Sequence, residues 1–184
     1  MRTTLLLFVS AASLMVLLSG CSGKEANPES APATAPPAAS ATPTFDFGKA
    51  KLAPDNGSGM EATLRITLSG GTQKPALIGM LIKDRQNGSN ACYPFHNLTN
   101  GARSLVTDAG AGVTLIDGAR STANSQCQLL ADGTQVIQDT NGITAVYHVR
   151  FLPSFKGLKH IWVAPEDGIG NGPEMQMVGD WTVK

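Results

Sequence analysis

Two ten-residue segments in which apolar and polar side chains alternate constrain the fold of this chain more than any other feature. In residues 60–69 the apolar positions are Met60, Ala62, Leu64, Ile66 and Leu68. Residues 143–152 repeat this alternation. A period of two is typical of a strand with one buried face. Because no segment after residue 44 shows a convincing helical period, the sequence predicts an all-β domain.

Shorter patterns predict additional strands between these two segments and after them. They fall at residues 77–82, 91–97, 104–107, 126–130, 159–164 and 177–183. Asn-Gly and Asp-Gly pairs lie between the strands and favour tight turns because they accept positive φ. We therefore expect an antiparallel, Ig-like β-sandwich of about seven to nine strands over residues 45–184.

The N-terminal residues look like a lipoprotein signal. Arg2 precedes an apolar run at 5–18, and the run ends in Leu18-Ser19-Gly20-Cys21. The run is short for a membrane span but suits a signal peptide. Its end resembles the bacterial lipobox, which implies a signal peptide at 1–20 and lipidation of Cys21, with acyl chains such as palmitate. An ordinary cleaved signal with a chance cysteine is the alternative.

The resemblance also implies an address in the cell. Ser22 follows the cysteine where an inner-membrane retention signal would place Asp. It therefore favours a lipid anchor in the outer membrane of the bacterial cell envelope, with the periplasmic or surface face left open. Each buried methylene contributes roughly 0.8 kcal/mol, so two or three acyl chains hold a protein firmly.

Residues 21–44 are predicted to be a lipidated cysteine followed by a disordered tether. Residues 22–44 contain five of the eleven prolines and seven alanines, but no Val, Ile, Leu or aromatic residue. Such a segment buries too little apolar surface to offset the entropy of ordering.

The charge balance argues against a nucleic-acid partner. The chain has 14 Lys+Arg against 14 Asp+Glu, and only 15% of its residues are charged. A nucleic-acid binder needs a clustered excess of basic side chains. The expected contact with the membrane is therefore through lipid and not through surface charge.

The three cysteines are expected to have two roles. One of them, Cys21, carries lipid, and the other two form a pair. With Cys21 lipidated, Cys92 and Cys127 remain in a compartment that permits oxidation, and we predict a disulfide between them. Two free buried thiols and a redox pair are the alternatives. A redox pair is normally close in sequence, as in C-x-x-C.

Four motifs in order resemble a known kind of module. They are Asn90-Ala91-Cys92-Tyr93, Asn124-Ser125-Gln126-Cys127, Phe151-Leu152-Pro153-Ser154-Phe155-Lys156-Gly157-Leu158-Lys159, and Gly179-Asp180-Trp181-Thr182-Val183. This order is similar to that of the single-disulfide, Ig-like sandwich modules found, often in tandem, in large secreted proteins of soil bacteria. The chain departs from that pattern in carrying one module on a tether and in having Met175-Gln176-Met177 where a Trp is common. The resemblance implies the fold and the disulfide more than an activity.

Residues typical of catalysis or metal binding form no recognisable pattern. His96, His148 and His160 lie far apart and lack metal-ligand spacing. No G-x-S-x-G motif occurs, and Ser58, in Asn56-Gly57-Ser58-Gly59, is expected in a turn. We therefore expect no cofactor, no metal and no enzyme activity. Residues 166–174 are acidic and glycine-rich enough to wrap Ca²⁺, although a plain loop is the favoured interpretation.

One strand offers a candidate ligand platform. If Cys92 faces inward, alternation turns Tyr93 and Phe95 to the opposite face, and Pro94 suggests a sheet edge. Exposed rings there would suit sugars or a protein, while loops covering both rings are the favoured alternative.

The sequence as a whole predicts a membrane-anchored, non-enzymatic module for adhesion, scaffolding or binding. The partner would be an unknown envelope protein or polysaccharide. The alternatives are a carbohydrate- or small-ligand-binding module that uses Tyr93 and Phe95, and an envelope enzyme.

Overall fold

The computed structural model describes residues 44–140 and 142–184. The predicted signal peptide, Cys21 and the tether up to residue 43 lie outside these residues. No helix in the described part of the chain has the length and apolar character needed to cross a bilayer.

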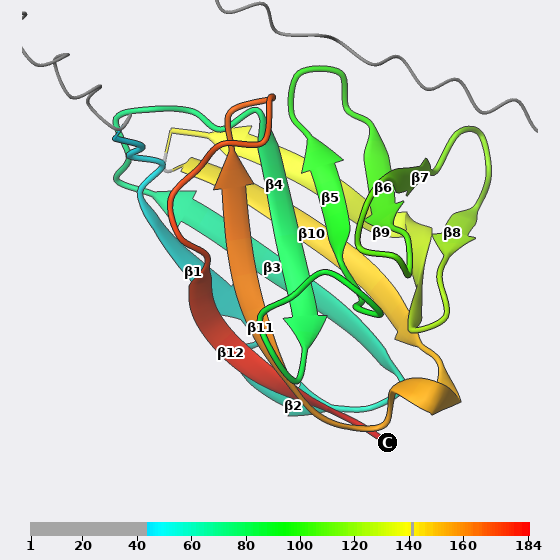
Figure 1. Cartoon of the computed structure of the whole chain (residues 1–184). Coiled ribbons are helices and arrows are strands. Elements are labelled where there is room, and N and C mark those ends of the chain that lie inside the picture. Colours follow the sequence, from blue (N-terminus) through cyan, green and yellow to red (C-terminus); the bar gives the residue numbers. More distant parts are fainter. Residues whose placement is uncertain (1–43, 141) are drawn as a thin grey trace, which may run out of the picture. The chain divides into compact units, whose positions relative to one another are not determined.

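Two sheets form the domain (Figure 1). The five-stranded sheet has the order β1 (Lys49–Ala53), β3 (Glu61–Ser69), β10 (Gly142–Phe151), β9 (Cys127–Asp139) and β8 (Ser121–Ala123). The seven-stranded sheet has the order β2 (Asn56–Ser58), β12 (Gln176–Val183), β11 (Gly157–Glu166), β4 (Leu77–Lys83), β5 (Pro94–Asn97), β6 (Arg103–Val106) and β7 (Val113–Leu115). Neighbours pair antiparallel except β2 and β12, which are parallel.

The core follows from the alternation that predicted the strands. In β3 and β10 the same alternate residues are buried, and the register sets Ile66 opposite Ala145 and Leu64 opposite Tyr147. The inward face of the other sheet supplies Ile78, Met80 and Ile82 among others. The prediction of an antiparallel β-sandwich is confirmed.

The number of strands differs from the prediction. Twelve strands occur among the described residues instead of seven to nine, because β1, β2, β7 and β8 were not predicted. β2 includes Ser58, so the expectation that this residue lies in a turn is wrong. β2, β7 and β8 have only three residues each and contain no fully buried residue, so no alternation marks them.

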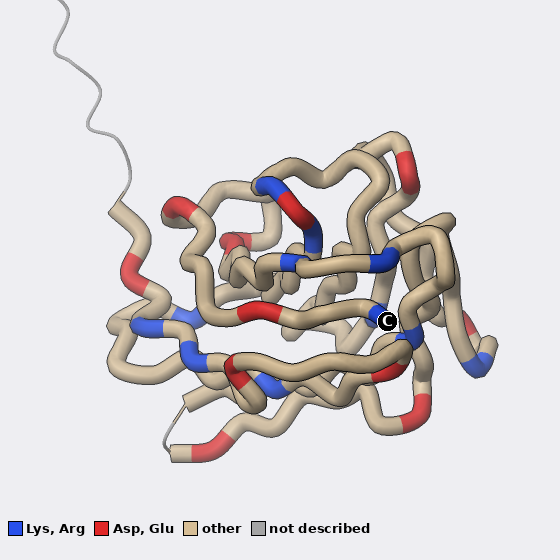
Figure 2. Tube along the Cα trace, turned by 90° about the horizontal axis from the view of Figure 1, so that it is seen from below, with Lys and Arg blue, Asp and Glu red and all other residues tan. Residues whose placement is uncertain are grey.

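Charged residues are spread around the domain. Figure 2 shows acidic and basic segments interspersed along the described trace. Some acidic and basic side chains form ion pairs. Arg150 and Glu61 are one such pair, with Nε and Oε2 2.9 Å apart. This distribution agrees with the near-zero net charge of the sequence.

The corner after β10 is filled by two phenylalanines. β10 ends at Phe151, and a 3₁₀ turn, η1 (Pro153–Phe155), follows. The Phe151 and Phe155 rings stack at 6.0 Å and both are buried. Pro153 cannot donate to a ladder, and Gly157 has φ +99°, so the strand ends here and the chain reverses.

The disulfide joins the two sheets. Cys92 forms an isolated bridge with Ile82 of β4, and Cys127 begins β9 of the opposite sheet. The two residues are bonded, with Cα atoms 5.5 Å apart and both side chains fully buried. The predicted disulfide is confirmed.

The sequence suggested that Pro94 lies at a sheet edge, and this expectation is wrong. β5 lies between β4 and β6. Pro94 is the first residue of β5, a position that a proline tolerates. On the β4 side, pairing stops at Phe95 and resumes at Cys92, because Pro94 has no N–H to donate between them.

Candidate functional site

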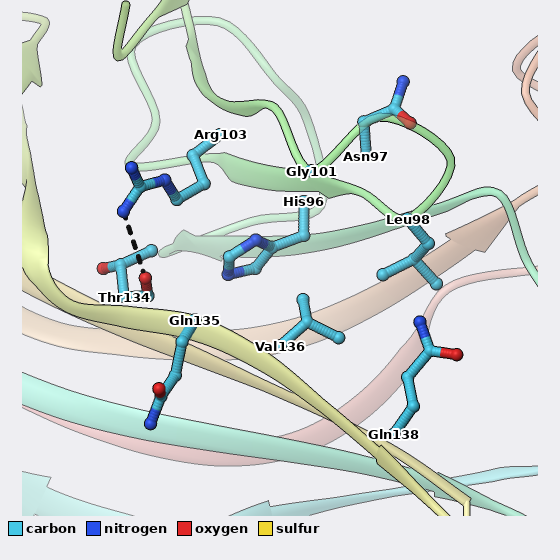
Figure 3. Close-up of a pocket in the computed structure, with 9 residues that line it drawn as sticks. All are labelled: His96, Asn97, Leu98, Gly101, Arg103, Thr134, Gln135, Val136 and Gln138. Atoms are coloured by element: carbon cyan, nitrogen blue, oxygen red, sulfur yellow. Dashed lines mark hydrogen bonds between the residues drawn. The ribbon is translucent and has the colours of Figure 1, made fainter. Parts of the chain in front are cut away.

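A hollow of about 360 Å³ opens between β9 and the turn that joins β5 to β6 (Figure 3). Its size falls in the range of small-ligand pockets. Its lining consists of His96, Asn97, Leu98, Gly101, Arg103, Thr134, Gln135, Val136 and Gln138. One wall therefore belongs to each sheet, and the hollow lies where the two sheets part.

The β9 wall is an unpaired strand edge. β8 pairs only with Gln128–Leu130, so within the described chain no strand pairs with the outer edge of β9 beyond that point. The carbonyl of Thr134 accepts a hydrogen bond from Arg103 and therefore points away from β10. Because backbone direction alternates along a strand, Val136 and Gln138 point their N–H and C=O groups the same way. The hollow is thus bordered by free backbone donors and acceptors.

Arg103 connects the two walls at one end. Its Nη1 donates to the carbonyl oxygens of Ala131 and Thr134, at 2.9 and 3.2 Å. The side chain reaches from β6 to β9 and donates to two backbone carbonyls of β9 that no neighbouring strand bonds within the described chain. Its cationic group lies at the end of the unpaired edge, as Figure 3 shows.

His96 forms the floor of the hollow. Its side chain is buried, its Nε2 lies 3.1 Å from the carbonyl oxygen of Val146, and its ring centroid lies 4.8 Å from that of Tyr147. Burial lowers the pKa of His96, and the Arg103 charge lowers it further, while the hydrogen bond with Val146 acts in the opposite direction. The imidazole is therefore neutral at neutral pH, which suits a structural floor.

Two smaller hollows share lining residues with this one and lie around the end of β9. Gln138 lines all three, and Leu98 lines the first and the next. Lys74, Pro75 and Ile143 are shared between the second and the third, each of about 250 Å³. The three hollows form one elongated groove, which we call the β9 groove. Its shape suits an extended chain more than a compact ligand.

The two predicted platform aromatics lie on the outer face of the seven-stranded sheet, opposite to Cys92, as alternation requires. Tyr93 is only 7% exposed, whereas Phe95 is half-buried. The two ring centroids are 4.5 Å apart, and both rings cover Gly79, where a Cβ would approach Phe95 to 2.5 Å. Tyr93 is therefore not exposed as a platform residue, and only Phe95 borders an open surface.

Phe95 lines a separate apolar hollow of about 340 Å³. Val113 and Leu115 of β7, 51% and 55% exposed, form its side, and Leu77 also lines it. Glu166 lies at its rim, where burial raises the pKa of the carboxyl and the nearby Asp167 raises it further. We call this the Phe95 hollow.

The loop at residues 166–174, for which calcium binding was the less favoured interpretation, is organised by one of its own carboxylates. Asp167 Oδ1 accepts hydrogen bonds from the backbone N–H groups of Ile169 and Asn171, at 3.1 and 2.9 Å, and Oδ2 accepts one from the Asn171 side chain. These bonds lower the pKa of Asp167. Among the described residues no group of three His, Cys, Asp or Glu side chains is placed to hold a metal. The geometry is that of a self-capped loop.

The other two histidines each contact a carboxylate that does not line the β9 groove. His148 Nε2 lies 2.7 Å from Glu61 Oε1, and its Nδ1 lies 2.8 Å from the carbonyl oxygen of Asp132. His160 Nδ1 lies 2.6 Å from Asp180 Oδ1. The three histidines therefore do not converge.

Reasoning from the sequence did not find the β9 groove. It predicted a strand that ends at residue 130, because Asp132-Gly133 looks like a turn. The strand instead continues through an irregularity in which Gly133 has φ +77° and the register with β10 shifts between Val146 and His148. The β-branched residues Thr134, Val136 and Ile137 after this point were the available signal, because such residues favour strands.

Comparison with protein-family profiles, curated proteins and solved structures finds no match for this chain.

Proposed function

We propose that this chain is a lipid-anchored protein of the bacterial cell envelope whose β-sandwich binds a partner without catalysis. The single observation that carries the binding role is the β9 groove, an elongated hollow beside an unpaired strand edge. The lipobox-like sequence before Cys21 supports the anchor. A disulfide between the sheets agrees with an exported, oxidising location.

The chemistry of the groove favours binding over catalysis. The residues that line its first hollow include no carboxylate and no cysteine. His96, its histidine, is buried and bonded to backbone, and Arg103 is committed to two carbonyls. Amide side chains and free backbone groups remain, and these suit recognition of an extended partner.

The anchor is tested by metabolic labelling with radioactive palmitate and by fractionation of the cells. The wild type should carry label and sediment with membranes, while Cys21→Ser should lose both properties. Ser22→Ala is the matched control and should stay labelled. An unlabelled wild type, or a Cys21→Ser variant that still sediments with membranes, contradicts the proposed anchor.

The binding role is tested by photo-crosslinking in intact envelopes. A photoreactive residue at Gln135, which lines the groove and is exposed, should capture a discrete partner. The same residue at Lys49, exposed on β1 at the far edge of the sheet, is the control and should not. Equal capture at both positions, or none at either, contradicts a binding role for the groove.

The Phe95 hollow supports a second candidate function, the binding of a small ligand or sugar. Its aromatic ring, exposed aliphatic side and single half-buried carboxyl resemble the lining of many ligand pockets. Titration with candidate sugars, monitored by ¹³C-methyl NMR of Val113 and Leu115, tests it. Unchanged methyl signals at millimolar sugar count against it.

A further inference from the structure

The unpaired edge of β9 is built to accept one more strand. Val136 and Gln138 together offer two N–H donors and two C=O acceptors toward the groove, because their backbone direction matches that of Thr134. A peptide that pairs there would extend the five-stranded sheet in the place that β8 leaves open. Buried backbone groups need such partners, so an occupant of this groove satisfies them best with backbone of its own.

The geometry of the groove selects a single extended chain over a second folded domain. The turn between β5 and β6, which contributes Asn97, Leu98 and Gly101, forms the wall opposite β9. A second copy would bring its own such turn into the same space. Beyond Gln138 the other two hollows lie beside the β9–β10 hairpin and the end of β3, where further residues of a peptide can lie.

The charge of the groove selects the sequence of that chain. The three hollows of the groove are lined by two cationic side chains, Arg103 and Lys74, and by one carboxylate, Asp139, in the third hollow. Lys74 is exposed at the rim. The side chains of Leu98 and Val136 supply apolar contacts between these charges. An acidic residue beside apolar ones complements this lining.

We propose that the β9 groove binds an extended acidic peptide segment of an envelope protein, which adds to β9 as a sixth strand of the five-stranded sheet. This inference rests on the proposed binding function and names the class of partner. The N–H groups of Val136 and Gln138 donate to the peptide backbone, and Lys74 faces its carboxylates. The charge of Arg103, whose Nη1 bonds two carbonyls of β9, adds to the attraction at the other end of the edge.

The test begins with a displayed library of random peptides of about twelve residues, panned on the purified full-length chain. Enriched peptides should alternate apolar residues and carry Asp or Glu. Their binding should protect the amide protons of Val136 and Gln138 from exchange, a readout that a purely structural role of these residues would not move. Failure to enrich any peptide, or enrichment of peptides without acidic residues, overturns the proposal.

A matched pair of variants tests the backbone contact. Gln138→Pro removes an N–H that faces the groove and not β10, so the sheet should tolerate it, as edge strands tolerate proline. Binding of the enriched peptides should weaken about tenfold or more. Gln138→Ala keeps the N–H and should bind within about threefold of wild type. Equal binding by Gln138→Pro and Gln138→Ala overturns strand addition.

Charge and self-association are tested alongside. Lys74→Glu should weaken acidic peptides about two- to fivefold, as expected for an exposed ion pair. A wild type that dimerises through this edge, with dimers lost in Gln138→Pro, would replace the peptide by a second copy and overturn the proposal. If Gln138→Pro still crosslinks the envelope partner at Gln135, strand addition fails while the proposed binding function stands.

Discussion

Removing the disulfide between Cys92 and Cys127 should lower the free energy of unfolding by about 3.8 kcal/mol. The bond closes a loop with a sequence separation of 35 residues. In the chain-entropy model, a loop of this length restricts the unfolded chain by about 3.8 kcal/mol at 25 °C. Both side chains are fully buried, so the double variant Cys92→Ala/Cys127→Ala also loses packing around two sulfur atoms.

Urea denaturation followed by tryptophan fluorescence measures this loss. For a slope of about 2 kcal/mol per molar urea, the midpoint should fall by about 2 M in the double variant. Wild type in excess reductant keeps the sulfur atoms and isolates the contribution of the crosslink. A loss below about 1 kcal/mol in both samples would refute the reasoning, because it would mean that the unfolded chain gains little freedom when the bond is absent.

Three further predictions concern the core and the floor of the groove. Tyr147→Phe removes the hydroxyl that donates to the carbonyl oxygen of Ile78 at 2.6 Å in the buried core, and thermal melts should show a loss of about 1 kcal/mol. Gly79→Ala places a methyl group 2.5 Å from the ring of Phe95; urea titration should show a loss of about 1–3 kcal/mol, and near-UV circular dichroism should change. Because the folded pKa of His96 is lowered from 6.5, the unfolded chain takes up the proton first, so stability should fall as the pH drops below about 6.5. In His96→Gln, urea midpoints measured from pH 7 to pH 5 should decline less steeply.

The sequence predicted those strands whose side chains alternate between a buried and an exposed face. β3 and β10 lie side by side in the five-stranded sheet, and their period of two records one face on the core and one toward solvent. The disulfide was predictable for a different reason, since two cysteines remained after Cys21 was assigned to lipid. The alternating strands are recorded in the local sequence, and the disulfide follows from the number of cysteines.

The short strands and the groove depend on contacts that the local sequence does not record. The three residues of β7 are all exposed, so no alternation marks them. The unpaired edge exists because β8 is short and stops opposite Leu130, which is a property of another strand. Tyr93 was expected outside the core, and it does lie on the outer face, but Trp162 and Met175 belong to a second apolar cluster that covers it. Burial of this kind arises from residues distant in the sequence.

The position of β12 in its sheet sets the order in which a growing chain completes this fold. β12 (Gln176–Val183) pairs with β11 on one side and with β2, more than a hundred residues earlier, on the other. A chain that is delivered from its N-terminus therefore leaves β2 without its partner until almost all of the domain has emerged. Contacts of such large separation slow folding. The domain can thus complete its fold only when almost all of its chain is available.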